Sequence, residues 1–154
     1  MKSQHAQYLE SKVLTAPPQR LHLMLIEGAI RFGRQAEQEL LAGSHANAAE
    51  PLMRVLDIVG ELLAGVRQTK SDINDKLATV YWFIFRRVSE ATMYADTTAL
   101  TEVLRLLEFE RETWQKVCEK LGANSGSPTT VPPPSHAFGV AQSTSQVSGV
   151  SLQA

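Results

Sequence analysis

Apolar residues recur every three or four positions along most of the first 122 residues, which is the period of an amphipathic helix. Residues 46–68 show this most clearly, with charged residues on the opposite face and apolar residues at Leu52, Val55, Leu56, Val59, Leu62, Leu63 and Val66. Neither a sustained period of two nor an Asn-Gly or Asp-Gly turn indicates a β-hairpin. The pattern therefore predicts an all-α chain.

Residues that favour helix starts and stops place the other helices. Pro17 and Pro18 suit a first helical turn, where a missing N–H leaves no intrahelical bond unmade, so a helix is expected from there to about residue 42. A third helix is expected over residues 71–95, and a fourth over residues 97–122, where a glycine ends it.

Four helices joined by short links favour one architecture. Short links make neighbouring helices antiparallel, which predicts an up-down-up-down four-helix bundle. We expect this bundle to occupy residues 1–122, with residues 1–16 as a short, displaceable N-terminal cap segment. Residues 123–154 carry no Asp, Glu, Lys or Arg and are rich in Ser, Thr, Gln and Pro, so we expect a disordered, low-complexity C-terminal tail.

More large apolar residues are present than the bundle interior needs. On the first helix the core stripe is assigned to Leu21, Met24, Leu25, Gly28, Phe32, Ala36 and Leu40, and on the third to Ile73, Leu77, Val80, Tyr81, Ile84, Val88 and Ala95. Six side chains then lie largely outside these stripes: Leu23, Ile26, Ile30, Trp82, Phe83 and Phe85. The three aromatic residues either contribute to a partner groove or thicken the core, and the sequence leaves both readings open.

A short apolar series precedes the first helix. Tyr8, Leu9, Val13 and Leu14 can fold back over the surplus apolar face of that helix. Burial of each side chain contributes on the order of 1.5 to 3 kcal/mol, and ordering the segment offsets most of this. A competing peptide could therefore displace the cap segment at small net cost.

Composition and charge exclude several classes of partner. The 154 residues include 15 Lys and Arg and 16 Asp and Glu, a net charge of −1, which supplies no basic field for nucleic acid or an anionic membrane. The apolar run at residues 80–85 is far shorter than the roughly 18 residues of a membrane span, and the N-terminus lacks the apolar core of a signal peptide. A single cysteine, Cys118, fits a reducing compartment. We expect a cytoplasmic protein without membrane insertion or nucleic-acid binding.

No group of residues indicates catalysis, a metal site or a cofactor. The four histidines are scattered, and neither a Glu-x-x-His pair nor a glycine-rich phosphate loop is present. One alternative is a histidine-phosphotransfer module, because such modules are also four-helix bundles and His22 lies on a helix; its flanking Leu21 and Leu23 argue against kinase access. The charge run of Glu108, Glu110, Arg111 and Glu112 is expected to be a solvated helix face.

Two groups of residues resemble the signature of a known family. Val13-Leu14-Thr15-Ala16-Pro17 is followed by Leu21, by Met24-Leu25 and by Gly28-Ala29-Ile30-Arg31-Phe32, while the last helix contains Arg111-Glu112-Thr113-Trp114. These motifs resemble those of the FliS flagellar secretion chaperones from about Tyr8 to Leu121. The chain departs from the family's usual Tyr-Asp at Ile26-Glu27, and from its Tyr-Asp-Tyr at Tyr81-Trp82-Phe83.

The resemblance implies a chaperone and not an enzyme. Such a protein binds the disordered C-terminal segment of flagellin in the cytoplasm, prevents its premature polymerisation, and hands it to the flagellar type III export apparatus. By the same resemblance, Tyr8, Leu9 and Leu14 have a gating role. We hypothesise that Leu23, Ile26 and Ile30 lie beneath this cap segment, and that Trp82, Phe83 and Phe85 contribute to the partner groove. The tail is either an inert extension or a segment that occupies this groove through Val131, Phe138 and Val140.

Overall fold

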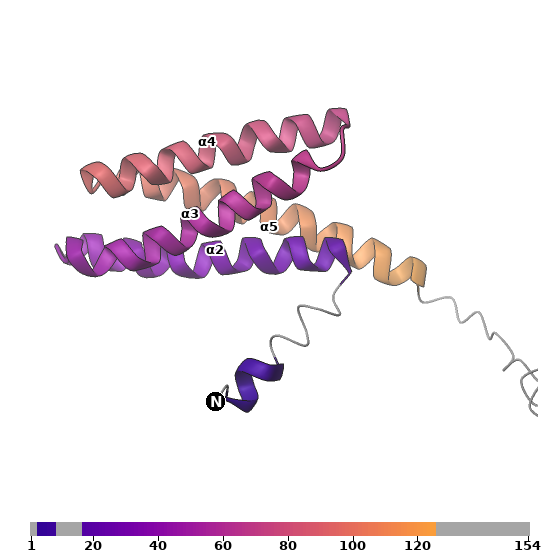
Figure 1. Cartoon of the computed structure of the whole chain (residues 1–154), viewed down its shortest axis with the longest axis horizontal. Helices are drawn as coiled ribbons and strands as arrows, with labels where there is room; N and C mark the ends of the chain where they lie inside the picture. The colour runs from indigo at the N-terminus through magenta and orange to yellow at the C-terminus, as the bar shows by residue number, and fades with distance from the viewer. Residues whose placement is uncertain (1–2, 9–16, 126–154) are drawn as a thin grey trace, which may run out of the picture. The chain divides into compact units, whose positions relative to one another are not determined.

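The computed structural model of the chain describes residues 3–8 and 17–125. A short helix at residues 4–8 precedes four long ones, α2 (Pro18–Leu41), α3 (His45–Arg67), α4 (Asp72–Tyr94) and α5 (Thr97–Ser125). The long helices run alternately back and forth along the bundle, with short connections at its ends (Figure 1). The predicted all-α four-helix bundle is confirmed.

Local residue chemistry explains where the helices begin. Pro18 occupies the first turn of α2, as predicted. The Ser71 hydroxyl accepts a hydrogen bond from the Asn74 N–H at 3.1 Å, and an Asp96 carboxylate oxygen accepts one from the Ala99 N–H at 3.1 Å. These two caps each satisfy a backbone donor that has no partner inside its own helix.

The predicted end of the last helix at Gly122 is wrong. Helix α5 continues through this glycine to Ser125. A glycine inside a helix costs only about 1 kcal/mol relative to alanine, so helix formation on both sides of it can outweigh that cost.

The core consists of apolar side chains from all four long helices. Most of the residues predicted from α3 are buried, with exposed fractions of 8% or less for Leu52, Val55, Val59, Leu62, Leu63 and Val66. Helix α4 contributes Tyr81, Ile84, Val88 and Ala91, and α5 contributes Ala99, Leu100, Val103, Leu104 and Leu107. Ile73, which was predicted to lie in the core, is instead 71% exposed, and Leu121 near the end of α5 is 42% exposed.

The structure corrects the orientation of α2. Leu23, Ile26 and Ile30, predicted to lie outside the bundle interior, are at most 8% exposed, and Ile26 and Ile30 belong to the central apolar cluster. Leu25 and Phe32, predicted to be central, are only partly buried against that cluster. The predicted stripe was partly wrong: its Gly28, Ala36 and Leu40 are buried, but the buried face is centred on Leu23, Ile26 and Ile30. Both sets have helical spacing, so periodicity alone could not choose between them.

Gly33 is the small residue on α2 that most clearly requires its size. A Cβ atom at this position would lie 2.7 Å from Leu104 Cδ2 of α5. The absence of a side chain at Gly33 therefore leaves room for the Leu104 side chain of α5. At Gly28 the nearest atom, Ile58 Cδ1 of α3, would be 3.5 Å away, an ordinary contact.

Several predictions concern residues outside the described ranges. Leu9 and Leu14 of the cap segment are among them, as are residues 126–154 of the tail, so their predicted roles stay predictions. Tyr8 is described, and it is 64% exposed. Within residues 3–8 and 17–125, no helix has the length and apolar character required to cross a membrane.

Candidate partner-binding groove

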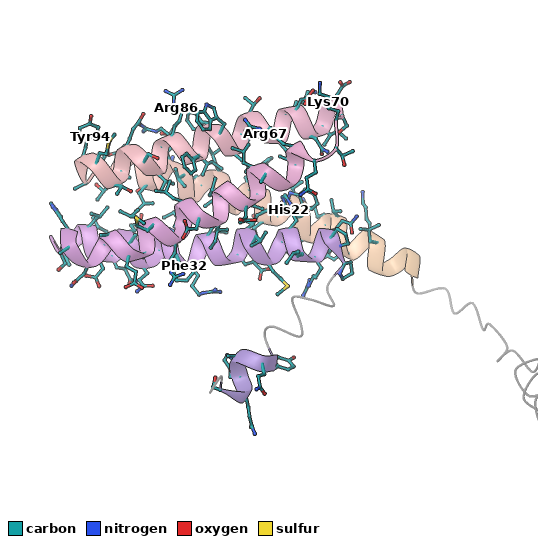
Figure 2. All side chains as sticks on the ribbon, viewed as in Figure 1. His22, Phe32, Arg67, Lys70, Arg86 and Tyr94 are labelled. Carbon is teal, nitrogen blue, oxygen red and sulfur yellow. The ribbon has the colours of Figure 1, made fainter. Side chains whose placement is uncertain are left out.

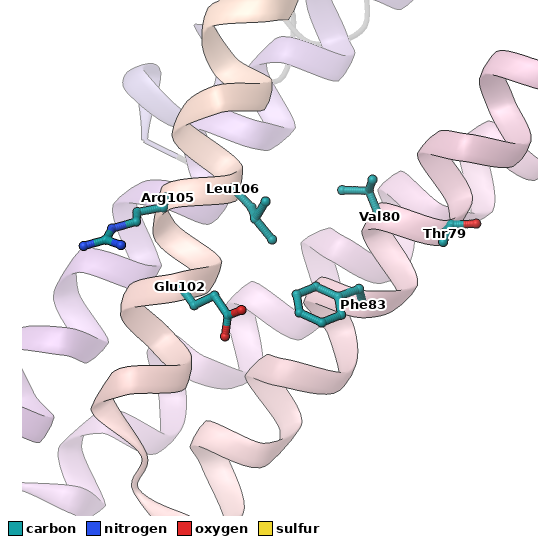
Figure 3. A pocket seen from close by; sticks show the side chains of 6 residues that line it. All are labelled: Thr79, Val80, Phe83, Glu102, Arg105 and Leu106. Carbon is teal, nitrogen blue, oxygen red and sulfur yellow. The ribbon is translucent and has the colours of Figure 1, made fainter.

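An open apolar groove of about 500 Å³ lies between α4 and α5. Figure 3 shows Val80 and Phe83 projecting from α4 toward the side on which Leu106 projects from α5. Phe83 is 39% exposed, so much of its ring is available to a partner. The complete lining is Thr79, Val80, Phe83, Glu102, Arg105 and Leu106.

The helix spacing explains why the groove forms at this position. The closest backbone approaches in the bundle are between α2 and α3 and between α3 and α4. Helices α4 and α5 are joined instead by long side chains, with Ile84 and Leu107 in the buried layer and the groove outside it. A gap between two helices that is apolar on both walls is a typical place for an amphipathic helix to bind.

The apolar surface extends beyond the residues that line the groove. Phe109 of α5, three residues after Leu106, is 66% exposed, and Ile73 of α4, seven residues before Val80, is 71% exposed. These spacings place each residue on the same side of its helix as the groove wall. The strip from Ile73 to Phe83 spans ten residues, or roughly 15 Å of helix.

The predicted aromatic group divides between two sides of α4. Phe83 lines the groove. Trp82 and Phe85 stack on each other with ring centroids 5.9 Å apart and ring planes at 6°, and Trp82 is 48% exposed. Successive helical residues are about 100° apart, so Trp82 and Phe83 point to different flanks. Phe85 also packs against the core, so it belongs partly to the core and partly to the aromatic pair with Trp82.

An ion pair lies at one end of the groove. Two nitrogens of the Arg87 guanidinium contact Oε2 of Glu102: Nε at 2.9 Å and one terminal nitrogen at 2.7 Å. Arg87 also forms an ion pair with Glu90 on its own helix. Glu102 itself lines the groove. The guanidinium of Arg105, by contrast, makes no ion pair among the described residues, and it points away from the groove (Figure 3).

A buried polar cluster joins three helices near the other end. Tyr81 Oη donates to Glu110 Oε2 at 3.1 Å and lies 2.6 Å from His22 Nε2, while Trp114 Nε1 donates to the same Glu110 oxygen at 3.3 Å. Because Tyr81 has only one hydroxyl proton, His22 must donate its Nε2–H to the tyrosine oxygen. Tyr81 Oη and Glu110 Oε2 then each take part in two hydrogen bonds.

Burial controls the ionisation of this cluster. It lowers the pKa of His22 to about 4, because the charged imidazolium loses hydration. It raises the pKa of Tyr81, and the neighbouring Glu110 charge and hydrogen bond add to the increase. His22 is also packed against Trp114, with ring centroids 3.9 Å apart. At neutral pH His22 is an uncharged hydrogen-bond donor that is held in place on both sides.

The prediction of a solvated charge run was wrong for Glu110. This carboxylate is 8% exposed, whereas Glu108 forms surface ion pairs with Arg34 at 3.5 Å and Arg111 at 2.8 Å. Position 110 lies three residues after Leu107 and four before Trp114, so its spacing placed it on the buried stripe. The spacing favours burial at this position, whereas the charged residue type favours a solvated face.

A second, more polar cleft of about 620 Å³ lies where α2 begins and α3 ends. His22 and Trp114 line it together with Leu21, Leu25 and other residues. Pro18, at the start of α2, also lines it. Among the described residues, no cluster of three or more His, Cys, Asp or Glu side chains could hold a metal ion.

Known proteins share sequence with the region that forms the bundle. Residues 1–121 match a family model described as "Flagellar protein FliS". The chain is 32% identical over 114 residues to the flagellar secretion chaperone FliS of Salmonella typhimurium, an alignment that covers 73% of this chain and 84% of that relative. It is 25% identical over 119 residues to the flagellar secretion chaperone FliS of Bacillus subtilis, covering 77% of this chain and 89% of that relative.

Proposed function

The chain belongs to the FliS family of flagellar proteins, and we propose that it is a cytoplasmic export chaperone for flagellin. In this proposal it binds the disordered C-terminal region of flagellin, prevents premature polymerisation and hands the client to the flagellar type III export apparatus. Two relatives named flagellar secretion chaperones support the general role. The client and its delivery are the parts that we infer.

The groove between α4 and α5 is the observation that carries the proposal. Its apolar walls and its extension through Ile73 and Phe109 offer a continuous surface to a segment that folds as it binds. Ordering such a segment costs roughly 2 to 5 kcal/mol, so the client must bury a long strip of side chains to bind stably. The Trp82–Phe85 stack on the other flank of α4 lets one client wrap around this helix.

The exposed fractions set the expected contribution of each aromatic ring. Full burial of a large apolar side chain is worth about 1.5 to 3 kcal/mol. Phe83, at 39% exposed, therefore has about 1 kcal/mol left to gain, and Trp82, at 48%, slightly more. Replacement of either residue with serine should weaken client binding by a factor of about five to ten.

Isothermal titration calorimetry of the full chain with the C-terminal segment of its cognate flagellin tests this site. Phe83→Ser and Trp82→Ser should weaken binding while the helical circular dichroism spectrum stays unchanged. Tyr94→Ser is the matched control, because Tyr94 is an aromatic residue on the same helix, is 75% exposed and lies at its last position (Figure 2). Equal affinities for all four proteins would remove the α4 aromatics from the site.

The cap segment is proposed to cover the cleft beside the start of α2. Tyr8, Leu9 and Leu14 supply apolar side chains, and the segment joins α2 at Pro17, next to the cleft. Leu23, Ile26 and Ile30, once expected beneath the cap, are buried in the bundle and have little surface to offer a partner. Leu9→Ser with Leu14→Ser should raise client affinity if the cap competes with the client. Unchanged or lower affinity would contradict the gating role.

No observation supports the histidine-phosphotransfer alternative. The imidazole of His22 lines the polar cleft, but its Nε2 is bonded to Tyr81 and its ring is packed against Trp114, so Nε2 is already engaged. Phosphotransfer needs an imidazole nitrogen that an incoming phosphoryl group can reach. Its low pKa reflects the same burial.

A further inference from the structure

We propose that Tyr81, Glu110 and Arg87 are positioning residues that set the width of the α4–α5 groove. This inference rests on the proposed function, because the groove width matters for client binding. It goes further by assigning affinity to three residues, Tyr81, Glu110 and Arg87, that lie beside the groove and do not line it.

The two side-chain bridges bracket the groove. The first joins Tyr81 of α4 to Glu110 of α5, and the second joins Arg87 of α4 to Glu102 of α5. Leu106, in the groove wall, lies midway along α5 between Glu102 and Glu110. The bridges are six residues apart on α4 and eight on α5, which corresponds to roughly 9 and 12 Å of helix.

The helix spacing makes such bridges important for α4 and α5. Helix pairs with close backbone contact, such as α2 and α3, have their separation fixed by the packing of main chain and small side chains. Helices α4 and α5 do not approach in this way, so the side chains that span the gap determine how far apart their walls stand. A groove that is too wide loses contacts steeply, because dispersion attraction falls off within about 1 Å of the optimum.

The bridges differ in their expected response to salt. The Tyr81–Glu110 bridge is buried and supported by His22 and Trp114, so salt should not screen it. Glu102 is exposed at 47% and Arg87 at 25% of their side-chain surface, so their ion pair should be screened. The groove therefore has one fixed end and one end whose width depends on ionic strength.

Spin-label distance measurements test the width without any client. In a Cys118→Ser background, labels are attached to Arg86→Cys on α4 and Glu112→Cys on α5, two exposed positions outside the groove lining. Tyr81→Phe should broaden or shift the distance distribution at both low and high salt. Arg87→Gln should broaden or shift the distance distribution at low salt only. In 1 M NaCl, where the Debye length is about 3 Å, the ion pair of the wild type is screened, so wild type and Arg87→Gln should give the same distribution.

Client affinity provides the second measurement. Tyr81→Phe should weaken flagellin-segment binding about tenfold at all salt concentrations, because it leaves the His22 donor beside an apolar ring and removes one donor from Glu110. Arg87→Gln should weaken it about threefold at low salt, with no difference from wild type at high salt. The double variant Arg87→Gln/Glu102→Gln should cost no more than either single variant, as expected for one shared interaction.

Each result supports or overturns the inference. Distance distributions that are identical in wild type and both variants would refute it, even if affinity changed. A parallel salt dependence of affinity in wild type and Arg87→Gln would also refute the role of the ion pair. Failure of wild type to bind the flagellin segment would contradict the proposed function, whereas the label distances would still decide the control of groove width. Arg87 lies at the surface, so its variant keeps the test valid if Tyr81→Phe fails to fold.

Discussion

Gly33 is the position at which α2 has the least space for a side chain. An alanine Cβ would lie 2.7 Å from Leu104 Cδ2 and 3.6 Å from Leu104 Cγ. Leu104 is 1% exposed and belongs to the central cluster, so any movement of its side chain displaces other buried residues. Gly33→Ala therefore forces either an unfavourable Leu104 rotamer or a small displacement of α2.

Two opposing terms determine the effect of Gly33→Ala on stability. Overpacking a core typically costs about 1 to 3 kcal/mol, whereas replacement of a helical glycine with alanine recovers about 1 kcal/mol of helix propensity. The net expectation is destabilisation by about 1 kcal/mol. Gly60→Ala on α3 is the matched control, because nothing lies within 4 Å of its added Cβ, and it should stabilise the bundle by up to about 1 kcal/mol.

Denaturant unfolding followed by far-UV circular dichroism measures both free energies. The reasoning predicts opposite signs for Gly33→Ala and Gly60→Ala, separated by about 2 kcal/mol. Leu104→Val removes the atom that clashes, so adding it to Gly33→Ala should cost less than the sum of the two single changes. The close-packing account would be refuted if Gly33→Ala stabilised the protein as much as Gly60→Ala.

Two further predictions concern pH and capping. The His22 pKa is about 4 when folded and about 6.5 when unfolded, so the unfolded state binds more protons between these values and stability falls as pH decreases through that window. The full shift corresponds to roughly 3 kcal/mol, which solvent screening of the partly exposed ring reduces to about 2 kcal/mol. Denaturant unfolding at pH 7 and pH 4 should show this loss, and His22→Gln should remove most of it; an unchanged slope would contradict the assignment. Ser71→Ala should lower stability by about 1 kcal/mol, because the Asn74 N–H loses its acceptor. Ser89→Ala is the control and should cost less, since the Ser89 hydroxyl bonds a carbonyl already used within α4. Equal losses of stability in thermal unfolding would rule out capping as the cause.

The sequence predicted the helices well because their signals are local. Pro18 at the start of α2 and the apolar spacing of α3 depend only on neighbouring residues, and both are confirmed. The family resemblance was also accessible, because it rests on residue types at fixed spacing, and the match over residues 1–121 confirms it.

The candidate site was only partly accessible from the sequence. Phe83 was predicted to contribute to a partner groove and lies in the wall between α4 and α5. Leu106 was not singled out, because a residue at core spacing cannot be identified as a groove wall until the neighbouring helix is placed. Glu110 was missed because charged residues are rarely buried, and its partner Tyr81 lies 29 positions earlier.

The sequence by itself determined that this chain forms four amphipathic helices and which family it resembles, because helix period, capping and motif spacing are properties of short segments. Only the tertiary structure decided which face of α2 turns inward, since Leu23, Ile26 and Ile30 compete with Leu21 and Leu25 for the same interior. In the observed orientation, with Leu23, Ile26 and Ile30 turned inward, Gly33 faces the Leu104 side chain of α5. The same holds for the groove, because its walls come from two different helices, α4 and α5, and the hydrogen bonds beside it join residues 15 and 29 positions apart in the sequence.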